Sequence, residues 1–275
     1  MPSTNSGAGP VLSIRDVSLV YNKGRVDEVT ALTRLNLELH QGDFLTIVGS
    51  NGAGKSSTVQ IISGAARPTT GTVTIDGKVV NTLPDYARAN LVARVFDDPR
   101  IGSAPDLSIE DNLALAMSRG KRRRLVFALS SNRRSRMRDE LARLQLGLEN
   151  RLHDRVGLLS AGQRQSLTMI MAALTRPKIL LLDEHLAALD PVTAVRVLEL
   201  TQEIASDMGC ATIMVTHNMQ RAIEVGNRLV VMSQGRVVKE ITEPEKSQLT
   251  VKNIVSHITG AGDAVTDRIL LSESD

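Results

Sequence analysis

Residues 49–56 have the types and the spacing that bind phosphate. They read Gly-Ser-Asn-Gly-Ala-Gly-Lys-Ser and fit the pattern G-x-x-x-x-G-K-[ST]. Glycines let the backbone turn so that its N–H groups point at phosphate oxygens, the lysine reaches the β and γ phosphates, and the hydroxyl binds Mg²⁺. A chance glycine-rich turn also matches the bare pattern, so the neighbouring residues decide. The predicted nucleotide contacts are Gly49, Ser50, Asn51, Gly52, Ala53, Gly54, Lys55, Ser56 and Ser57.

Two acidic residues follow an apolar run further along the chain. Residues 179–182 read as a strand buried on both faces, and Asp183 and Glu184 come directly after it. A carboxylate at a strand end can hold Mg²⁺, and its neighbour can accept a proton from an attacking water. An acidic cap on the strand would explain this pattern by itself. With a phosphate loop upstream, we interpret Asp183 and Ser56 as metal ligands and Glu184 as a catalytic base.

A capped helix start precedes the acidic pair. Ser160, Ala161, Gly162 and Gln163 lead into a helical pattern, with Ser160 in the capping position. The free N–H groups of a helix N-terminus favour an anion. Alone this would be only a well-capped helix, but its place upstream of Asp183 favours a second phosphate contact.

The segments around these residues show strand and helix patterns that can position them. The apolar run at 44–48 and the helical pattern from 57 give the phosphate loop the strand–loop–helix context that it needs. Residues 11–21 and 31–40 alternate between apolar and polar, which predicts antiparallel strands. Asp76-Gly77 predicts a two-residue hairpin turn.

From about 98 to 177 the pattern becomes helical, and strands and helices then alternate again. We therefore predict an α/β fold with an antiparallel β subdomain and an inserted helical subdomain at 98–177. The main domain is placed at 11–260, between a flexible N-terminus at 1–10 and a tail at 261–275. The predicted helices and late strands cover 108–117, 135–146, 161–174, 191–205, 211–215 and 229–232, with a short helix from Asn218.

Composition limits the remaining possibilities. The chain is 42% apolar but has only five aromatic residues, which predicts a core of aliphatic side chains. Cys210 is the single cysteine, so no disulfide or thiolate metal site is expected. No apolar run approaches the roughly 18 residues that span a bilayer.

Basic residues are concentrated in one segment. Residues 119–138 hold nine basic side chains and no acidic one, although the net charge is only +3. Such a run is typical of a solvated surface, or of a surface that contacts anionic lipid. Nucleic acid is not expected as a partner, because Phe127 is the only aromatic residue there for stacking.

Taken in order, the motifs resemble the nucleotide-binding subunits of ABC transporters. The phosphate loop, the signature at 159–163, the acidic strand end at 179–184, the turn at 188–190 and Thr216-His217 follow the family's order. The similarity runs from about Val11 to His257. It implies a P-loop ATPase core that hydrolyses ATP with Mg²⁺.

The resemblance also implies roles for individual residues. Two copies would form a homodimer, with each ATP between one copy's phosphate loop and the other copy's signature. Tyr21 resembles the aromatic residue that stacks on adenine, and His217 the γ-phosphate sensor that acts with Glu184 and Lys55. Asp190 resembles the residue that couples the two sites.

Several shorter phrases resemble a bacterial importer group for tryptophan, tyrosine or related small solutes. This group implies an integral membrane permease, an extracytoplasmic solute-binding protein and a place on the cytoplasmic side of the cell membrane. The phrases are Arg94-Val-Phe-x-Asp-Pro99, residues 147–151, Asp183-Glu-His185 and residues 215–219.

Three positions depart from the family pattern. Ala161 replaces the usual first glycine of the signature, and Leu186 replaces a usual threonine. Asp97 replaces a glutamine that contacts Mg²⁺ and water, so Asp97 is a candidate metal ligand that slows hydrolysis.

We therefore predict an ATPase subunit that dimerises on ATP and powers an importer of an amino-acid-like solute. Two alternatives remain, namely a non-transport ABC ATPase acting on nucleic acid or the ribosome, and a weakly hydrolysing regulatory module.

Overall fold

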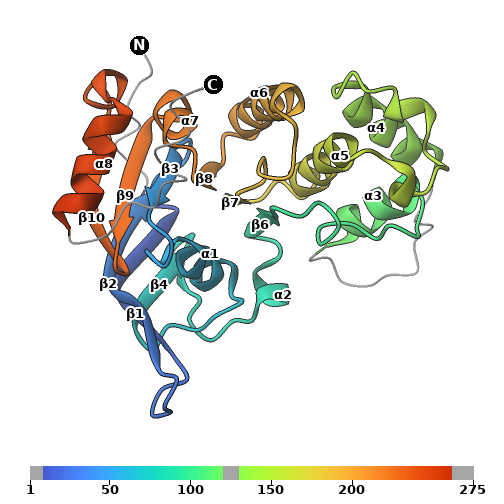
Figure 1. The fold of residues 1–275 in the computed structure, drawn as a ribbon. Helices are drawn as coiled ribbons and strands as arrows, with labels where there is room; N and C mark the ends of the chain where they lie inside the picture. The colour runs from blue at the N-terminus through green and yellow to red at the C-terminus, as the bar shows by residue number, and fades with distance from the viewer. Residues whose placement is uncertain (1–8, 120–129, 262–275) are drawn as a thin grey trace.

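The computed structural model describes residues 9–119 and 130–261, so predictions for residues 1–8, 120–129 and 262–275 lie outside it. The strands of the described residues form a small antiparallel sheet and a larger, mostly parallel one (Figure 1). No helix in this part of the chain is long and apolar enough to cross a membrane.

The small sheet has the strand order β2-β1-β4-β5, with antiparallel neighbours throughout. The antiparallel pair predicted near the N-terminus and the hairpin at Asp76-Gly77 are both confirmed. The bounds are β1 Leu12–Tyr21, β2 Val29–Leu39, β4 Thr70–Ile75 and β5 Lys78–Val79.

The larger sheet has the order β10-β9-β3-β8-β7-β6, and only β10 runs antiparallel to its neighbour. β7 and β8 are buried along their whole length, as the continuous apolar sequence of β7 predicts. The bounds are β3 Phe44–Gly49, β6 Val92–Val95, β7 Ile179–Asp183, β8 Ala211–Val215, β9 Arg228–Ser233 and β10 Arg236–Thr242.

Alternate residues of β7 belong to two cores on opposite faces of the larger sheet. Leu181 packs in the cluster shared with α1 and the small sheet. Leu180 and Leu182 pack in the cluster shared with α3, α4, α5 and α6. The larger sheet is therefore the central layer, and its strand ends are held firmly from both sides (Figure 1).

The helices α3, α4 and α5 lie between β6 and β7 in the chain, within the segment predicted to be helical. α4 begins and ends four residues earlier than expected, because Ser130 caps it by accepting a hydrogen bond from the Arg133 N–H. The helix bounds are α1 Lys55–Ser63, α2 Asp85–Arg88, α3 Ile109–Ser118, α4 Ser131–Ala142, α5 Ala161–Ala173, α6 Pro191–Met208, α7 Met219–Glu224 and α8 Val251–Gly260.

Two late elements had not been predicted. β10 forms the sheet edge, and its residues alternate between exposed and half-buried until Ile241. α8 begins at Thr250, whose side chain forms a capping box with Asn253, and it packs Ile254 and Ile258 on β9 and α7. β10 therefore extends the sheet beyond β9, and α8 packs against β9.

Candidate functional site

The phosphate loop joins the end of β3 to the start of α1, which confirms the strand–loop–helix context. Gly54 caps α1 with a φ of 97°, a left-handed conformation that favours glycine. A Cβ on Gly49 would lie 2.2 Å from the Met232 carbonyl oxygen, so only glycine fits there. The Gly235 N–H donates to the Ala53 carbonyl at 3.1 Å, so the turn between β9 and β10 supports the loop.

Lys55 is folded back onto its own loop. Its Nζ donates to the carbonyl oxygens of Gly49 at 2.8 Å and Ser50 at 2.9 Å. Burial lowers the pKa of Lys55, while the negative charges of Glu184 and Asp183 oppose this shift. The ammonium group thus lies in the field of the predicted base, Glu184, and of the predicted metal ligand, Asp183.

β7 delivers the acidic pair to the carboxyl end of the sheet. Asp183 is its last residue and pairs with Val215 of β8. Glu184 leaves the strand with a φ of 50°, and its N–H donates to the Val215 carbonyl at 3.0 Å. A positive φ is unfavourable for a residue other than glycine, and this hydrogen bond stabilises the backbone turn at Glu184.

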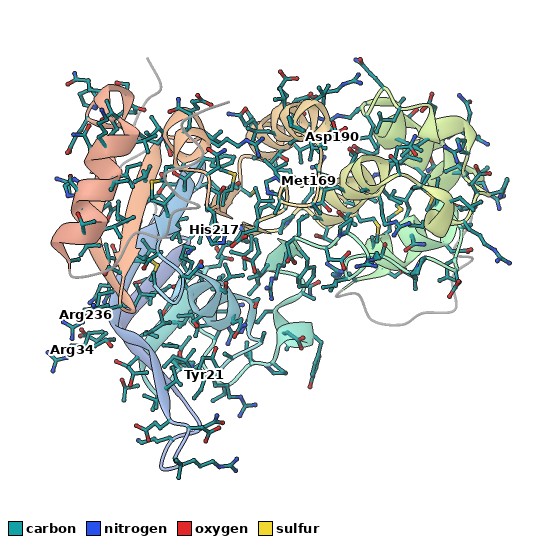
Figure 2. The ribbon with its side chains drawn as sticks, in the orientation of Figure 1. Tyr21, Arg34, Met169, Asp190, His217 and Arg236 are labelled. Atoms are coloured by element: carbon teal, nitrogen blue, oxygen red, sulfur yellow. The ribbon has the colours of Figure 1, made fainter. Side chains whose placement is uncertain are left out.

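Glu184 and His217 come from different segments of the chain, and the structure brings them together. Nε2 of His217, which is labelled in Figure 2, is 2.6 Å from Oε1 of Glu184, and both side chains are partly open to solvent. His217 follows β8, and the Asn218 side chain caps α7 directly after it. The parallel pairing of β7 and β8 therefore brings a candidate base and a histidine within hydrogen-bond distance.

Arg94 is a site residue for which the sequence predicted no role. Its Nη2 lies 2.6 Å from Oδ2 of Asp183, and its guanidinium carbon is 4.5 Å from the centre of the Phe96 ring. β6 and β7 are parallel neighbours, and Arg94 lies opposite Leu181. This contact could not be predicted from the sequence of β6 alone, because the order of strands in the sheet decides which strand lies next to β6.

The signature residues start α5. The Ser160 hydroxyl accepts from the Gln163 N–H at 3.2 Å, and the Gln163 side chain accepts from the Ser160 N–H at 3.1 Å. This reciprocal capping box fixes the turn at Ala161 and Gly162. A Cβ on Gly162 would lie 2.2 Å from Cγ2 of Thr193, so this glycine allows α5 to approach the start of α6.

Asp190 lies at the same contact between α5 and α6. It caps α6, and its Oδ1 accepts from the Thr193 N–H at 3.0 Å (Figure 2). Hydrogen bonds from Thr193 lower the pKa of Asp190, which is exposed. Thr193 thus donates its N–H to Asp190 and packs its methyl group close to Gly162. It links these two residues, both of which are predicted to contact ATP.

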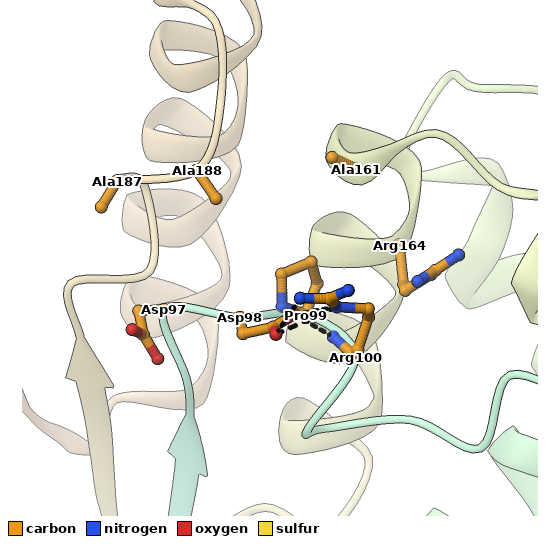
Figure 3. A pocket seen from close by; sticks show the side chains of 8 residues that line it. All are labelled: Asp97, Asp98, Pro99, Arg100, Ala161, Arg164, Ala187 and Ala188. Carbon is orange, nitrogen blue, oxygen red and sulfur yellow. Dashed lines mark hydrogen bonds and ion pairs between the residues drawn. The ribbon is translucent and has the colours of Figure 1, made fainter.

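Asp97 follows β6 and is exposed. It lines a cleft of about 480 Å³ between the loop after β6, the start of α5 and the loop after β7. Figure 3 shows the Asp97 carboxylate on the side nearest the end of β7, apart from the Asp98–Arg100 pair. Arg100 and Arg164 also line this cleft, and Arg100 pairs with Asp98. Among the described residues, Asp97 itself forms no ion pair within 4.0 Å.

Tyr21 ends β1 and packs partly against the core. Its hydroxyl donates to Oε1 of Gln60 on α1 at 2.7 Å (Figure 2). The ring is therefore tied to the helix that follows the phosphate loop. This position is compatible with a base contact next to the phosphates, which stays a prediction.

His185 is a buried residue next to the proposed catalytic pair, and its burial was not predicted from the sequence. Burial, aided by the positive charge of Arg221, lowers its pKa to about 3. Its Nε2 lies 3.3 Å from the Thr201 hydroxyl, and its carbonyl accepts from the Gln165 side chain at 2.7 Å. His185 is therefore neutral at pH 7 and joins α5, α6 and the loop after β7.

The oxygen donors fit magnesium. Asp183 lies at the end of β7 and Ser56 in the first turn of α1, both beside the phosphate loop. Within residues 9–119 and 130–261, no group of three or more His, Cys, Asp or Glu side chains could form a metal cage. Magnesium is commonly held by one or two protein oxygens together with substrate phosphates, which is the donor set present here.

The predicted site residues thus fall into two groups. One contains the phosphate loop, Asp183, Glu184 and His217 at the strand ends. The other contains residues 160–163 and Asp190 at the starts of α5 and α6. Among the described residues, no hydrogen bond or ion pair joins the two groups directly.

Comparison with known proteins places these features in one family. The family model described as ABC transporter matches residues 32–187. A tyrosine transport ATP-binding protein of Clostridioides difficile is 39% identical over 245 residues, which cover 89% of this chain and 97% of that protein. A methionine import ATP-binding protein of Bacillus subtilis is 32% identical over 257 residues, which cover 90% of this chain and 72% of that protein.

The fold is similar to that of a solved ATP-binding cassette. That structure is a dimer in a post-hydrolysis state bound to ADP and Pi. Its TM-score to this chain is 0.72 at 28% identity, covering 84% of this chain and 98% of the cassette. The predicted α/β P-loop ATPase fold is confirmed by this similarity.

Proposed function

This chain belongs to the ABC transporter family and is an ATPase of an import system, and from this premise we propose that it powers uptake of an amino-acid-like solute. The observation that carries the proposal is the separation of the two groups of site residues. A phosphate loop with its acids and a signature helix are both present in one chain, but no hydrogen bond or ion pair joins them within the described residues. A second copy, related by a two-fold axis, supplies each site with what it lacks.

In this dimer, ATP binds to the phosphate loop of one copy. Lys55 leaves the carbonyl oxygens that it now contacts and pairs with the β and γ phosphates. Tyr21, tied to α1 by Gln60, stacks on the base. The partner copy contributes the N-terminus of its α5 and the Asp190 turn to the γ-phosphate.

Hydrolysis depends on the pair at the strand ends. Glu184 accepts the proton of an attacking water, and His217, which lies 2.6 Å from it, orients its carboxylate and senses the γ-phosphate. Asp183, Ser56 and the more exposed Asp97 are the proposed magnesium ligands. Bound Mg²⁺ supplies positive charge that stabilises the phosphoryl group in the transition state.

The solute class is inferred from relatives. The Clostridioides difficile relative is a tyrosine transport protein, and the Bacillus subtilis relative is a methionine import protein. Other similar proteins import spermidine and putrescine, with 28% identity over 265 residues in Mycoplasma mycoides. The 39% identity to the tyrosine transport protein favours an amino-acid-like solute for this chain.

The proposed partners follow from this role. An integral membrane permease holds the homodimer at the cytoplasmic face of the membrane, and an extracytoplasmic binding protein delivers the solute. Arg136 and Arg138 are exposed on α4, whereas Arg134 pairs with Glu110 at 2.5 Å. We place the two exposed arginines near anionic lipid headgroups, where each contributes about 1 kcal/mol.

Reconstitution tests the proposal. The chain would be purified with its permease and binding protein, placed in proteoliposomes, and assayed for ATP turnover with tyrosine, tryptophan, methionine and spermidine in turn. We expect an amino acid to raise turnover, with Glu184→Gln as the inactive control. Stimulation by spermidine alone would contradict the solute class, and turnover that is independent of the permease would contradict the transport role.

A further inference from the structure

Arg94 lies at the reaction centre but has no part in the reaction as proposed. It is the third residue of β6, and its side chain crosses to the end of the neighbouring β7. There Nη2 contacts Oδ2 of Asp183 at 2.6 Å. The two side chains are only 20% and 13% exposed, so water screens this pair far less than a surface ion pair.

The guanidinium is held in place on its other side as well. Its central carbon lies 4.5 Å from the centre of the Phe96 ring, a cation–π distance. The Phe96 backbone carbonyl accepts from the Gln165 side chain at 3.1 Å, which ties the backbone of this residue to α5. Arg94 Nε is buried and has no hydrogen-bond partner among the described residues. The orientation of this arginine is therefore fixed by the ring and by Asp183.

The contact uses one oxygen of the proposed metal ligand. Oδ2 of Asp183 accepts from Arg94, and Oδ1 has no hydrogen bond within the described part of the chain. The carboxylate also lies in the field of Lys55. Asp183 therefore sits between two cations, and any third positive charge that it binds is repelled by both.

We propose that Arg94 is a positioning residue that fixes the Asp183 carboxylate through Oδ2 and weakens its hold on the divalent cation. The inference rests on the proposed role of Asp183 as a magnesium ligand. Arg94 leaves Oδ1 as the oxygen for the metal and prevents the carboxylate from rotating. Its charge also lowers the affinity of the site for the cation, so that positioning and weak binding come from the same side chain.

Arg94→Met tests both effects, because it keeps an unbranched apolar stem and removes the charge and the hydrogen bond. Metal affinity would be measured with Mn²⁺ by EPR, with ATP present and in a Glu184→Gln background that blocks hydrolysis. We expect Arg94→Met to lower the half-saturating Mn²⁺ concentration about tenfold, since a nearby cation is removed from a poorly screened site. Turnover at saturating Mg²⁺, in the chain with Glu184, should fall.

Arg94→Lys and Asp183→Asn complete the test. Arg94→Lys keeps the charge, so its Mn²⁺ affinity should remain within about twofold of the parent. Asp183→Asn should weaken Mn²⁺ binding, because it removes the ligand. If Asp183→Asn leaves Mn²⁺ binding unchanged, the proposed role of Asp183 and the inference on Arg94 both fail. If Asp183→Asn weakens binding but Arg94→Met does not tighten it, only the inference on Arg94 is overturned.

Arg228→Met is the matched control for a loss of folding. Arg228 is also a partly buried arginine, 15% exposed, and it pairs with Asp43, which directly precedes β3 of the same sheet. It lies at the opposite end of the strands, so its replacement should lower the thermal unfolding temperature without altering Mn²⁺ affinity. An equal shift in Mn²⁺ affinity in both variants would overturn the inference, because the effect would then come from loosening of the sheet.

Discussion

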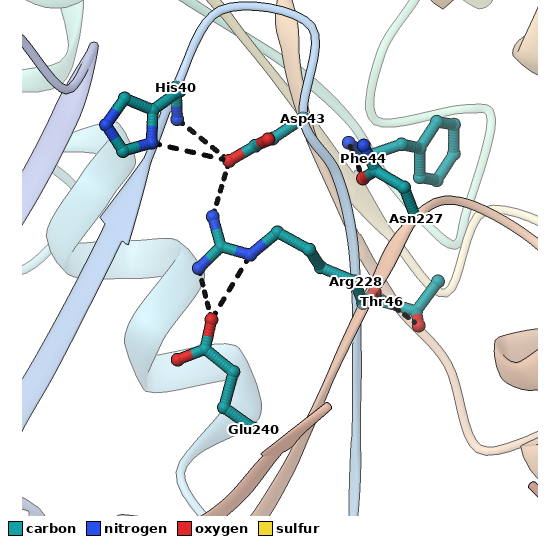
Figure 4. A network of polar contacts seen from close by, with 7 residues as sticks. All are labelled: His40, Asp43, Phe44, Thr46, Asn227, Arg228 and Glu240. Atoms are coloured by element: carbon teal, nitrogen blue, oxygen red, sulfur yellow. Dashed lines mark hydrogen bonds and ion pairs between the residues drawn. The ribbon is translucent and has the colours of Figure 1, made fainter. Parts of the chain in front are cut away.

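The central sheet has a partly buried arginine–aspartate pair at each end. At the carboxyl end of the strands, Arg94 contacts Asp183 beside the phosphate loop. At the amino end, Arg228 contacts both Asp43 and Glu240, and Asp43 also accepts from the His40 N–H at 2.9 Å (Figure 4). The two pairs share a residue type, a sheet and a similar burial, but their surroundings differ.

The difference lies in how completely each network is satisfied. Burial lowers the pKa of Arg228, but the hydrogen bonds and charges of Glu240 and Asp43 outweigh it and raise the pKa. Around Arg94, one nitrogen is buried without a partner and Asp183 keeps one oxygen without a hydrogen bond within the described residues. The amino end is a closed network that stabilises the sheet. The carboxyl end keeps bonding capacity for a ligand.

The largest effect is expected at the carboxyl end. Glu184→Gln removes the proposed base and should reduce ATP turnover by about 10²–10⁴-fold, the usual range for general base catalysis. The phosphate contacts remain, so ATP and Mg²⁺ should trap a dimer that is visible by size-exclusion chromatography. Glu240→Gln at the amino end is the control, with lower stability and normal turnover expected. Unchanged turnover in Glu184→Gln would remove Glu184 from the catalytic role.

At the amino end the expected loss is in stability. Arg228→Met leaves Asp43 partly buried without its cation and should lower the free energy of unfolding by roughly 2–4 kcal/mol. Denaturant unfolding measures the loss, and turnover per folded molecule should stay normal. If Arg228→Met is as stable as the parent but hydrolyses ATP slowly, the amino end has a role in catalysis and the distinction between the two ends is wrong.

His185 should make the carboxyl end sensitive to acid. Its pKa is about 3 in the folded chain and 6.5 ordinarily, so folding requires the neutral ring. The neutral His185 ring contributes its full share to the free energy of unfolding above about pH 6.5. This contribution decreases as the pH falls toward 3, and the loss at pH 5 is roughly 2 kcal/mol. Unfolding of the parent and of His185→Gln, compared at pH 7.5 and 5, isolates this loss. Equal pH dependence in both proteins would show that His185 is not its source.

The smallest expected effect concerns Asp97. Asp97→Gln removes a negative charge, which would repel the attacking water as that water becomes hydroxide-like. The substitution also lengthens the side chain to that of the glutamine usual in the family. Turnover should rise by up to about tenfold, which corresponds to ~1.4 kcal/mol. Asp106→Gln changes another exposed aspartate of the same connection and should leave turnover unaltered. If both variants match the parent in steady-state kinetics, the idea that Asp97 slows hydrolysis is wrong.

Elements with strong local signals were predicted from the sequence. Continuous apolar residues predicted β7, alternation predicted β1 and β2, and Asp76-Gly77 predicted the hairpin. The capping residue Ser160 marked the start of α5. β10 was not predicted, because it is an edge strand whose burial is set by packing rather than by an apolar run.

By itself the sequence determined that the chain carries a phosphate-loop pattern, an acidic strand end and a signature, and it predicted their chemistry, because each is a run of a few consecutive residues. Only the tertiary structure decided that Arg94 pairs with Asp183, that His217 reaches Glu184, that Thr193 meets Gly162 and that His185 is buried. These contacts depend on the order of parallel strands and on helices packed across them. Residues that lie far apart in the chain and meet only in the fold produce no pattern of spacing in a single sequence. Their contacts could therefore be identified only from the packing of the strands and helices.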